Sequence, residues 1–371
     1  MNYKEILWGI ISDVNTITEK KEYNKYIKMH PIGKIFALLL YHQYAGLQYG
    51  RSLTLQIQNL LFNPRSTPSQ GELSKKLQYR LPVELWTKIY QNLLMQAKNI
   101  KSKKLGKAIS RLIRIIDSTH LTATPSMKWA KHRKTKNGLK IHLMIDGDTI
   151  PNAFKLKNGN SSDKKSLKWA IKQDFIYVFD RGYNDFSMFA WIGDQGASFV
   201  TRASANIHYE TIKNHKVGNR QKEKGILADS VIRVIKDRKS GETLQLRMVS
   251  FEFIDSKGDY QNFSLLTDLK TMRSDIIADI YRERWNIEVV FYWIKTFLKV
   301  KHWMSRSKNG LLIQLYSALI AYLMVLIARL GNNMHFKIMR DYAHKYSGII
   351  LRFLAEYNKF MKIEEFLLFS S

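Results

Sequence analysis

Two short apolar runs, each followed at once by an aspartate, constrain the fold of this chain most strongly. Leu112–Ile116 and Phe175–Phe179 are rich in β-branched and aromatic residues, which favours buried strands. Asp117 follows the first run and Asp180 follows the second. Strands that alternate with helical segments are typical of an α/β domain, in which functional groups gather at the carboxyl ends of the strands.

The segments around these two runs extend the alternation of strands and helices. Lys140–Asp146 alternates apolar and polar residues, as a half-buried strand does. The other expected elements are strands at Asn152–Leu156 and Ser198–Thr201, a helix at Asp185–Ile192, and a helix that Asp163 caps and that runs through Trp169. From about residue 203 to 268 strands dominate instead, at Val231–Ile235, Leu244–Phe253 and Asn262–Asp268. We therefore predict a β-rich insertion in the α/β domain.

A helix from about residue 272 to 300 is expected after the insertion, and its polar residues fall on one stripe. At about 100° per residue, a stripe about 60° wide holds Tyr281, Arg284, Glu288 and Lys295. The rest of this helix is mostly apolar, so we expect the helix to be buried. In a structural alternative, Arg284 and Glu288 form an ordinary ion pair one turn apart while Lys295 reaches the solvent.

Asp117, Asp180 and Glu288 have the chemistry of a two-metal site. Two divalent ions about 3.5–4 Å apart need bridging carboxylates, and such a pair supports in-line phosphoryl displacement. Asp117 would bridge both ions, while Asp180 and Glu288 would complete one site each. A ligand set made only of oxygen atoms favours Mg²⁺ or Mn²⁺ over zinc.

Structural roles compete with these assignments. Asp117 and Asp180 are also common residue types in helix caps and turns. The rival carboxylates of the same region are Asp146, Asp148 and Asp163. Asp146 ends a strand, but the Gly147-Asp148 that follows is typical of a hairpin turn. The spacing of the two nearby histidines, His120 and His142, is not that of a zinc site. We interpret both as packing residues or phosphate contacts.

The first hundred residues have helical periodicity, most clearly in Ile35–Leu47 and Val83–Met95. Leu53–Leu61, a polar connection and Ser69–Arg80 resemble a helix-turn-helix, in which Ser69 and the Glu72 three residues later would form a capping box. Two interpretations stay open here: a helix that reads DNA, or an ordinary hairpin of two helices with a basic solvated face.

The charge of the chain indicates a polyanionic partner. Its 371 residues include 60 Lys and Arg against 31 Asp and Glu, a formal net charge of +29. Nucleic acid is the commonest partner of so basic a protein, and a membrane surface is the alternative. Lys98–Arg114 alone carries seven basic residues and no acid, which suits either contact with phosphates or a solvated surface strip.

Length and composition limit the remaining possibilities. A chain of 371 residues suggests two or three domains. It has no cysteine, which excludes disulfides and thiolate metal sites and fits a reducing cytoplasm. The start MNYKEILWGII lacks the features of a signal peptide. Leu311–Ala328 is at the length limit of a membrane span, and we expect it to be a buried core helix instead.

The polar stripe carries a motif that resembles a known family. Tyr281, Arg284, Glu288 and Lys295 match the Y-x2-R-x3-E-x6-K motif of bacterial DDE transposases of the IS-four family of insertion sequences. Asp117, in IIDSTHL, is similar to the first aspartate of that family. Asp180, in VFDRGY, is similar to the second, which stands before a glycine and an aromatic residue.

The resemblance implies a role for each of these residues. The three carboxylates Asp117, Asp180 and Glu288 would be catalytic and would hold two Mg²⁺ ions, for which Mn²⁺ would substitute. Arg284 and Lys295 would contact phosphates, and Tyr281 would contact the DNA at the cleaved end.

The resemblance also implies an organisation of the chain. It predicts an α/β, ribonuclease-H-like catalytic domain with a β-rich insertion, preceded by a helical N-terminal domain. The expected parts are a DNA-binding domain at 1–105, the first part of the core at 106–202, the insertion at 203–268, the second part of the core with the glutamate helix at 269–335, and a helical tail at 336–371.

The implied function is that of a DNA transposase. It would bind the terminal inverted repeats of an insertion sequence and the target DNA, and it would catalyse two-metal strand cleavage and strand transfer by a cut-and-paste route. It would act as a homodimer or higher multimer, without a membrane, in the bacterial cytoplasm near the nucleoid. The alternatives are another ribonuclease-H-like two-metal nuclease and a non-catalytic DNA-binding regulator.

Some members of that family form a DNA hairpin and hold a flipped base on an aromatic residue. The segment 203–268 contains no tryptophan. The aromatic residues that would serve instead are Tyr209, Phe251, Phe253 and Tyr260.

Overall fold

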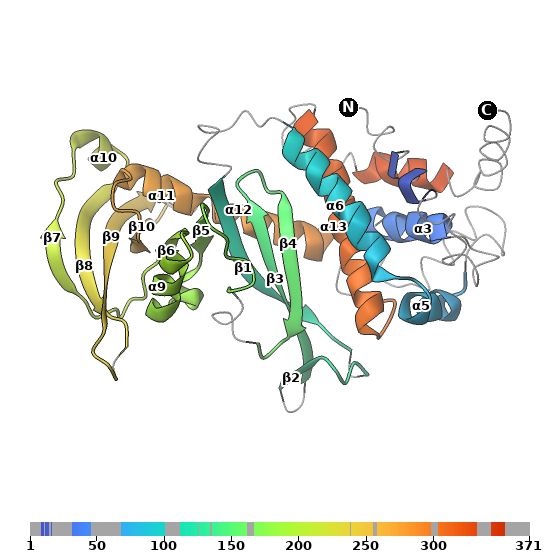
Figure 1. Ribbon diagram of the computed structural model, residues 1–371. Helices are drawn as coiled ribbons and strands as arrows, with labels where there is room; N and C mark the ends of the chain where they lie inside the picture. Colours follow the sequence, from blue (N-terminus) through green and yellow to red (C-terminus); the bar gives the residue numbers. More distant parts are fainter. Residues whose placement is uncertain are drawn as a thin grey trace. The chain divides into compact units, whose positions relative to one another are not determined.

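The computed structural model describes residues 9–10, 12–14, 16, 32–45, 68–100, 112–124, 126–133, 136–161, 167–237, 239–254, 258–297, 303–331 and 343–352 (Figure 1). The chain divides into two compact units. The first combines Met1–Ser102, Leu121–Gly138 and Phe291–Ser371, and the second combines Lys103–His120 with Leu139–Val290. Helices and one large mixed sheet make up the described residues, so the predicted α/β class is confirmed.

The sheet of the second unit runs in the order β4-β3-β1-β5-β6-β10-β9-β8-β7 (Figure 1). Its strands are β1 (Ile113–Thr122), β3 (Lys136–Asp146), β4 (Pro151–Asn158), β5 (Ile176–Phe179), β6 (Ser198–Arg202), β7 (Glu210–Asn214), β8 (Ile226–Ile235), β9 (Thr243–Ile254) and β10 (Tyr260–Thr267). The helical elements of this unit are η1 (Arg181–Tyr183), α9 (Phe186–Asp194), α10 (Asn219–Glu223), α11 (Ser274–Arg282) and the start of α12 (Trp285–Tyr292). The short strand β2 (Lys131–Arg133) pairs with the first residues of β3 in the first unit.

The pairing of the strands joins the β-rich segment to the rest of the sheet. β1, β5 and β6 are parallel neighbours, with Ile115 opposite Val178 and Val178 opposite Val200. β10 pairs antiparallel with β6, and β9, β8 and β7 follow as further antiparallel neighbours. The predicted β-rich segment therefore continues the sheet of the α/β core, and β10 is the strand that connects them.

Aromatic side chains between the sheet and α9 form the core around the loop that follows β5. The rings of Phe189 and Phe199 stack with their centroids 4.3 Å apart, and Phe179 lies 6.0 Å and 6.1 Å from them. All three are buried. The carboxylate of Asp185 caps α9 by accepting the N–H of Met188. Packing and capping together fix the start of α9, and with it the loop after β5.

In the first unit, the long helix α13 (Lys308–Gly331) packs against three helices, α3 (Ile32–Tyr44), α5 (Gln70–Tyr79) and α6 (Val83–Asn99). It is long and apolar enough to cross a membrane, but 89% of its most apolar window is buried. The indole N–H of Trp86 donates to the hydroxyl of Ser317 at 2.9 Å, which satisfies a polar group in this core. The prediction of a buried core helix is confirmed.

The continuous helix predicted from 272 to 300 is wrong. α11 ends at Arg282, α12 begins at Trp285, and a π-helix, η2 (Trp293–Phe297), follows. At the break, the N–H of Arg284 bonds the carbonyl of Tyr281, three residues back rather than four. The helix that carries Tyr281 therefore ends before Arg284, Glu288 lies on a second helix, and Lys295 lies on a π-helix.

Several expectations lie outside the described residues. They concern the helix at Leu53–Leu61, most of the basic stretch Lys98–Arg114, the cap at Asp163 and most of the tail 336–371. Within the described residues, the hydroxyl of Ser69 accepts the N–H of Glu72, which confirms the predicted start of a helix at this point. The five-part division of the chain stays a prediction.

Replacement of Gly225 by Ala should destabilise the second unit. Gly225 has a φ of +84°, and an added Cβ would lie 2.3 Å from the carbonyl oxygen of Glu252. We expect the free energy of unfolding to fall by about 2–4 kcal/mol. The added side chain makes the left-handed backbone unfavourable, and its Cβ displaces β9 at Glu252. Chemical denaturation measures it. Gly193→Ala, at an open position of α9, is the matched control and should be neutral or gain up to about 1 kcal/mol. Equal effects of the two variants would contradict this account of Gly225.

Candidate active site

Asp117 and Asp180 lie at the same level of adjacent parallel strands. Ile115 is opposite Val178 in the pairing of β1 with β5, so the same register places Asp117 beside Asp180 two residues later. Asp180 directly follows β5, as predicted. Asp117 lies inside β1, which runs on to Thr122, so its predicted position at a strand end is wrong. The segment after Asp117 includes β-branched threonines that favour an extended backbone and prolong the strand.

A backbone N–H fixes one oxygen of each aspartate. Oδ1 of Asp117 accepts the N–H of Ser118 at 2.7 Å, and Oδ1 of Asp180 accepts the N–H of Arg181 at 2.7 Å. The second contact makes Asp180 the N-cap of η1, so the capping role considered for Asp180 is confirmed. Because only one oxygen of each carboxylate is used in this way, the other can face a cation.

Arg284 links two carboxylates of the site. Its Nη1 lies 3.6 Å from Oδ2 of Asp117 and 3.4 Å from Oε1 of Glu288. The ion pair between Arg284 and Glu288 that we considered as a structural alternative is therefore present. The side chains of Asp117 and Arg284 are only 17% and 16% exposed, so a partly buried anion is compensated by a partly buried cation.

Glu288 differs from its expected environment, because its side chain is 45% exposed and not buried. In the described parts of the chain, no three His, Asp or Glu side chains lie close enough together to hold a metal ion. The carboxylates nevertheless form an oxygen-only donor set of the kind that Mg²⁺ and Mn²⁺ accept. In the structure Arg284 occupies the space between Asp117 and Glu288.

The electrostatics of the site follow from burial and from this ion pairing. Burial raises the pKa of Asp117 to about 6, with Glu288 and Asp180 adding to the rise, while Ser118 and Arg284 oppose it. Burial alone would lower the pKa of Arg284, but Tyr281 and the three carboxylates raise it above its usual value. Arg284 therefore stays a cation among acids.

Tyr281 and Lys295 belong to different compact units. Tyr281 is buried at the end of α11, where its ring meets that of Phe263 edge-on with the centroids 5.6 Å apart. Burial raises the pKa of its phenol above the usual value, and Asp180 adds to the rise. Lys295 is half-buried in η2, which belongs to the first unit, so its membership of the site stays a prediction.

The β-rich segment holds α11, the helix of Tyr281, in place. Arg247 of β9 forms a bidentate pair with Asp229 of β8 at 2.6 Å and 2.8 Å, and both side chains are buried. Nη1 of Arg247 also donates to carbonyls of the segment that leads into α11, those of Leu269, Lys270 and Met272. A buried guanidinium with all these acceptors fixes the start of α11 against the sheet.

An aromatic pocket of about 340 Å³ adjoins Tyr281 and Arg284. The residues that matter for its chemistry are Arg202, Phe251, Phe253, Phe263, Tyr281 and Arg284. The guanidinium of Arg202 lies 4.6 Å from the centroid of the Phe263 ring, close enough for a cation–π contact. Arg202 is not among the residues predicted from the sequence. The signal that could have found it is a cation at the end of the strand next to that of Asp180.

The rival carboxylates have structural roles or lie outside the described residues. Oδ1 of Asp146 accepts the N–H groups of Asp148 and Ile150, each at 3.1 Å, which confirms the predicted hairpin turn after β3. Asp163 lies outside the described residues. His142 is buried on β3 and His120 is exposed on β1. Both histidines keep the packing or phosphate-contact interpretation as a prediction.

Comparison with known proteins gives the family of this chain. The family described as "Transposase DDE domain" matches residues 109–324, which is more than half of the chain. This chain belongs to the DDE transposase family. The matched segment includes Asp117, Asp180 and Glu288. Membership supports a transposase function, and it implies an enzyme that cleaves or transfers DNA.

Three proteins named as transposases are similar to this member of the DDE transposase family. The protein y4zB of Sinorhizobium fredii is 26% identical over 288 residues, which cover 77% of each chain. A protein of the element IS5377 of Geobacillus stearothermophilus is 24% identical and covers 57% of this chain and 55% of its own. A protein of the element IS4SA of a Synechocystis species is 25% identical and covers 57% and 58%. This chain thus spans little more than half the length of the last two.

Replacement of Asp117 by Asn should stabilise the transposase above pH 6 when no divalent ion is present. The pKa of about 6 in the folded chain exceeds the usual 3.8, so the folded state binds the proton more tightly. The stability from this proton is complete below pH 4 and is lost as the pH rises through 6. The loss is at most about 3 kcal/mol, since one pKa unit corresponds to about 1.4 kcal/mol.

Thermal unfolding in EDTA, followed from pH 4 to pH 8, measures this difference. The Asn variant should gain stability over the wild type as the pH rises, and the two should converge near pH 4. Asp194→Asn, at an exposed carboxylate of α9, is the matched control and should show no such trend. Parallel pH profiles for the wild type and the Asp117 variant would contradict the raised pKa.

Proposed function

We propose that this chain is the transposase of a bacterial insertion sequence of the IS-four family. It binds the terminal inverted repeats of its element and catalyses DNA strand cleavage and strand transfer with two metal ions. The observation that carries the proposal is the level shared by Asp117 and Asp180 on parallel strands, with Arg284 between Asp117 and Glu288. Acids that hold metal ions, next to a cation that binds phosphate, are what phosphoryl transfer requires.

A ribonuclease-H-like core is the finer fold assignment that we propose. The order β4-β3-β1-β5-β6, with β1, β5 and β6 parallel, supports it. β7, β8, β9 and β10 then form the β-rich insertion before the glutamate helix, and the helices of residues 1–105 form the DNA-binding domain. In this arrangement the insertion fixes the position of α11 through the buried pair of Arg247 and Asp229.

Asp117, Asp180 and Glu288 are the residues that would hold the metal ions. When bound, two divalent ions activate the attacking water or hydroxyl and stabilise the leaving oxygen. The carboxylates fit Mg²⁺ by donor chemistry, and Mn²⁺ has the same preference. Arg284 offers a planar guanidinium for bidentate contact with a phosphate, and it compensates Asp117 and Glu288 in the structure described here.

The remaining contacts with DNA follow from the same arrangement. We assign Tyr281 to the DNA at the cleaved end and Lys295 to a phosphate. Phe251 and Phe253 line the aromatic pocket with Tyr281 and Arg284, which supports these two over Tyr209 and Tyr260 as the residues that hold a flipped base. Stacking on aromatic rings is the usual way to hold an unpaired base.

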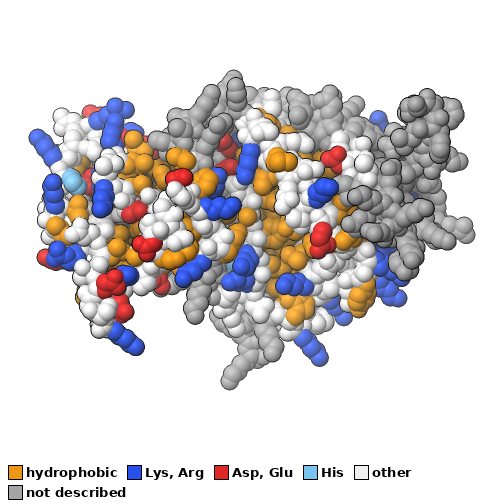
Figure 2. Space-filling model, in the orientation of Figure 1, with side chains coloured by type: hydrophobic (Ala, Val, Ile, Leu, Met, Phe, Trp, Pro, Cys, Tyr) orange, Lys and Arg blue, Asp and Glu red, His pale blue; other side chains and the backbone are white. Residues whose placement is uncertain are grey.

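The partners and place of action are part of the proposal. Lys and Arg side chains are spread over the visible face of the molecule, as a protein that binds long DNA requires (Figure 2). The net charge of +29 has the sign that attracts the terminal repeats and the target DNA. The active assembly is a homodimer or higher multimer on DNA, in the bacterial cytoplasm near the nucleoid.

Cleavage of an end-labelled duplex is the decisive experiment. The duplex carries the DNA that flanks the coding sequence of this chain, and the reaction contains Mg²⁺. Wild-type protein should cut at the end of the element. Asp117→Asn, Asp180→Asn and Glu288→Gln should each lower the cleavage rate about a hundredfold or more and keep DNA binding, since each removes a charge at the reacting phosphate.

Exposed carboxylates supply the controls for this experiment. Asp194→Asn and Glu252→Gln remove similar charges elsewhere in the second unit and should cleave like the wild type. Binding without cleavage by the wild type, in both Mg²⁺ and Mn²⁺, would contradict the enzyme and favour a DNA-binding regulator. Cleavage that persists in Glu288→Gln would mean that another residue is the third ligand.

Metal binding should be measurable apart from activity. Titration calorimetry with Mn²⁺, on free and DNA-bound protein, should give binding in the wild type and none in Asp117→Asn. An ion at a hundred times its dissociation constant should stabilise the folded wild type by about 2.7 kcal/mol, seen as a higher melting temperature. Equal binding in both proteins would exclude Asp117 as a ligand.

A further inference from the structure

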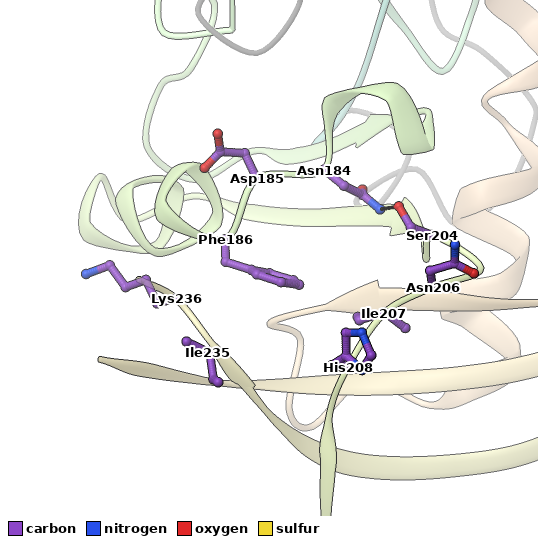
Figure 3. Close-up of a pocket in the computed structure, with 9 residues that line it drawn as sticks. All are labelled: Asn184, Asp185, Phe186, Ser204, Asn206, Ile207, His208, Ile235 and Lys236. Carbon is purple, nitrogen blue, oxygen red and sulfur yellow. Dashed lines mark hydrogen bonds between the residues drawn. The ribbon is translucent and has the colours of Figure 1, made fainter. Parts of the chain in front are cut away.

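A second pocket, of about 360 Å³, lies beyond the end of the strand that leads to Asp180 (Figure 3). The loop before α9, the segment after β6 and the end of β8 line it. η1, which Asp180 caps, ends next to Asn184, the first of the lining residues. The pocket therefore starts four residues after a proposed active-site carboxylate. Ligands of α/β sheets bind at this edge, beyond the carboxyl ends of parallel strands.

The side chain of Asn184 ties this pocket to the active-site edge. It accepts the hydroxyl of Thr201 at 3.1 Å, and it donates to the carbonyl of Arg202 at 3.0 Å and to the hydroxyl of Ser204 at 3.1 Å. Figure 3 shows the last of these bonds. Together they fix the loop after Asp180 to the end of β6. The pocket is thus preformed, as binding sites for small groups usually are.

The lining combines an aromatic ring with polar groups that are not used by the protein. Phe186, the first residue of α9, extends its ring into the pocket, and Ile207 and Ile235 lie on the other side (Figure 3). Asn206 and His208 are exposed, and neither side chain makes a hydrogen bond to another described residue. A flat apolar wall with amide and imidazole groups beside it suits a nucleobase, which stacks on its face and forms hydrogen bonds at its edge.

Other ligands fit this lining less well. Asp185 is its one carboxylate among the described residues, and a single carboxylate is a weak ligand set for a hard divalent ion. Lys236 is paired with Glu242 at 2.8 Å, so a phosphate group would find little free positive charge. The lining sets apolar side chains, those of Phe186, Ile207 and Ile235, beside neutral polar ones, which favours a base over either ion.

We propose that this pocket, called the base pocket below, takes an unpaired base of the DNA whose phosphate lies at Asp117 and Asp180. The proposal rests on the proposed transposase function, because the active site must present the DNA. The base pocket is separate from the aromatic pocket, since no residue lines both. It therefore holds a different nucleotide from the one assigned to Phe251 and Phe253.

The test is a thermodynamic cycle between the DNA base and the pocket. Duplexes with the DNA that flanks the coding sequence carry one abasic nucleotide, at each position in turn. Their dissociation constants are measured in EDTA by fluorescence anisotropy. The pocket variant is Asn206→Ala combined with His208→Ala, two exposed positions at which folding should be retained and is checked by thermal unfolding. Asn219→Ala, at an exposed amide of α10 outside the pocket, is the matched control.

For the wild type, an abasic nucleotide at one particular position should change the dissociation constant by about tenfold, as expected when a stacked base is removed. The pocket variant should lose most of this dependence at that position, and Asn219→Ala should keep it. Two results would overturn the base pocket. In the first, the abasic nucleotide changes the dissociation constant by the same factor in the wild type and the pocket variant at every position. In the second, no abasic position changes the dissociation constant of the wild type.

The same samples separate this result from the proposed function. Intact duplex is incubated with Mg²⁺ in parallel. Cleavage by the wild type, together with independent effects in the cycle, overturns the base pocket alone. Absence of both binding and cleavage by the wild type overturns the transposase function, and the base pocket with it.

Discussion

The geometry of this site depends on how Arg284 is shared between acids. Asp117 lies inside a strand of the sheet, where burial disfavours its charge. Arg284 makes that charge tolerable from 3.6 Å away, and it holds the more exposed Glu288 at 3.4 Å. If Arg284 moved away and no other cation took its place, the charges of Asp117 and Glu288 would be left uncompensated. The break between α11 and α12 sets where the guanidinium lies, so a local turn of the backbone controls the charge balance of the site.

The β-rich segment also fixes the position of a helix that follows it, α11. Arg247 and Asp229 form a buried pair inside it, and Arg247 also binds the carbonyls that precede α11. Lys224, just after α10, adds an ion pair with the buried carboxylate of Asp275 at 3.2 Å. The start of α11 is therefore fixed by its contacts with β9 and with the residue after α10. These contacts therefore also set the position of Tyr281.

Periodicity and residue type were sufficient for some features and not for others. The β-branched run before Asp180 and the helix start at Asp185 are local signals, and both elements formed as predicted. The threonines after Asp117 are a local signal for the extension of β1, but an aspartate at the end of an apolar run outweighed them in the prediction. The break before Trp285 depends on a hydrogen bond that spans three residues instead of four, which the apolar periodicity does not encode. The two pockets are harder still, because each is lined by residues that are distant in the sequence and come together only in the folded sheet. Candidate carboxylates could be named from the sequence, and their environments could not.

The continuity of the sheet has a consequence for how such proteins diversify. β10 borders β6 directly, whereas β7 is an outer strand whose five residues are all exposed. Chain can be gained or lost at β7 without removing the buried pair that Asp229 of β8 forms with Arg247 of β9. Removal of β10 would instead leave β6 without its neighbour next to Arg202. We therefore expect related chains to differ at β7 and to keep β9 and β10. A change at β7 therefore leaves the strands that carry Asp117 and lead to Asp180 as they are.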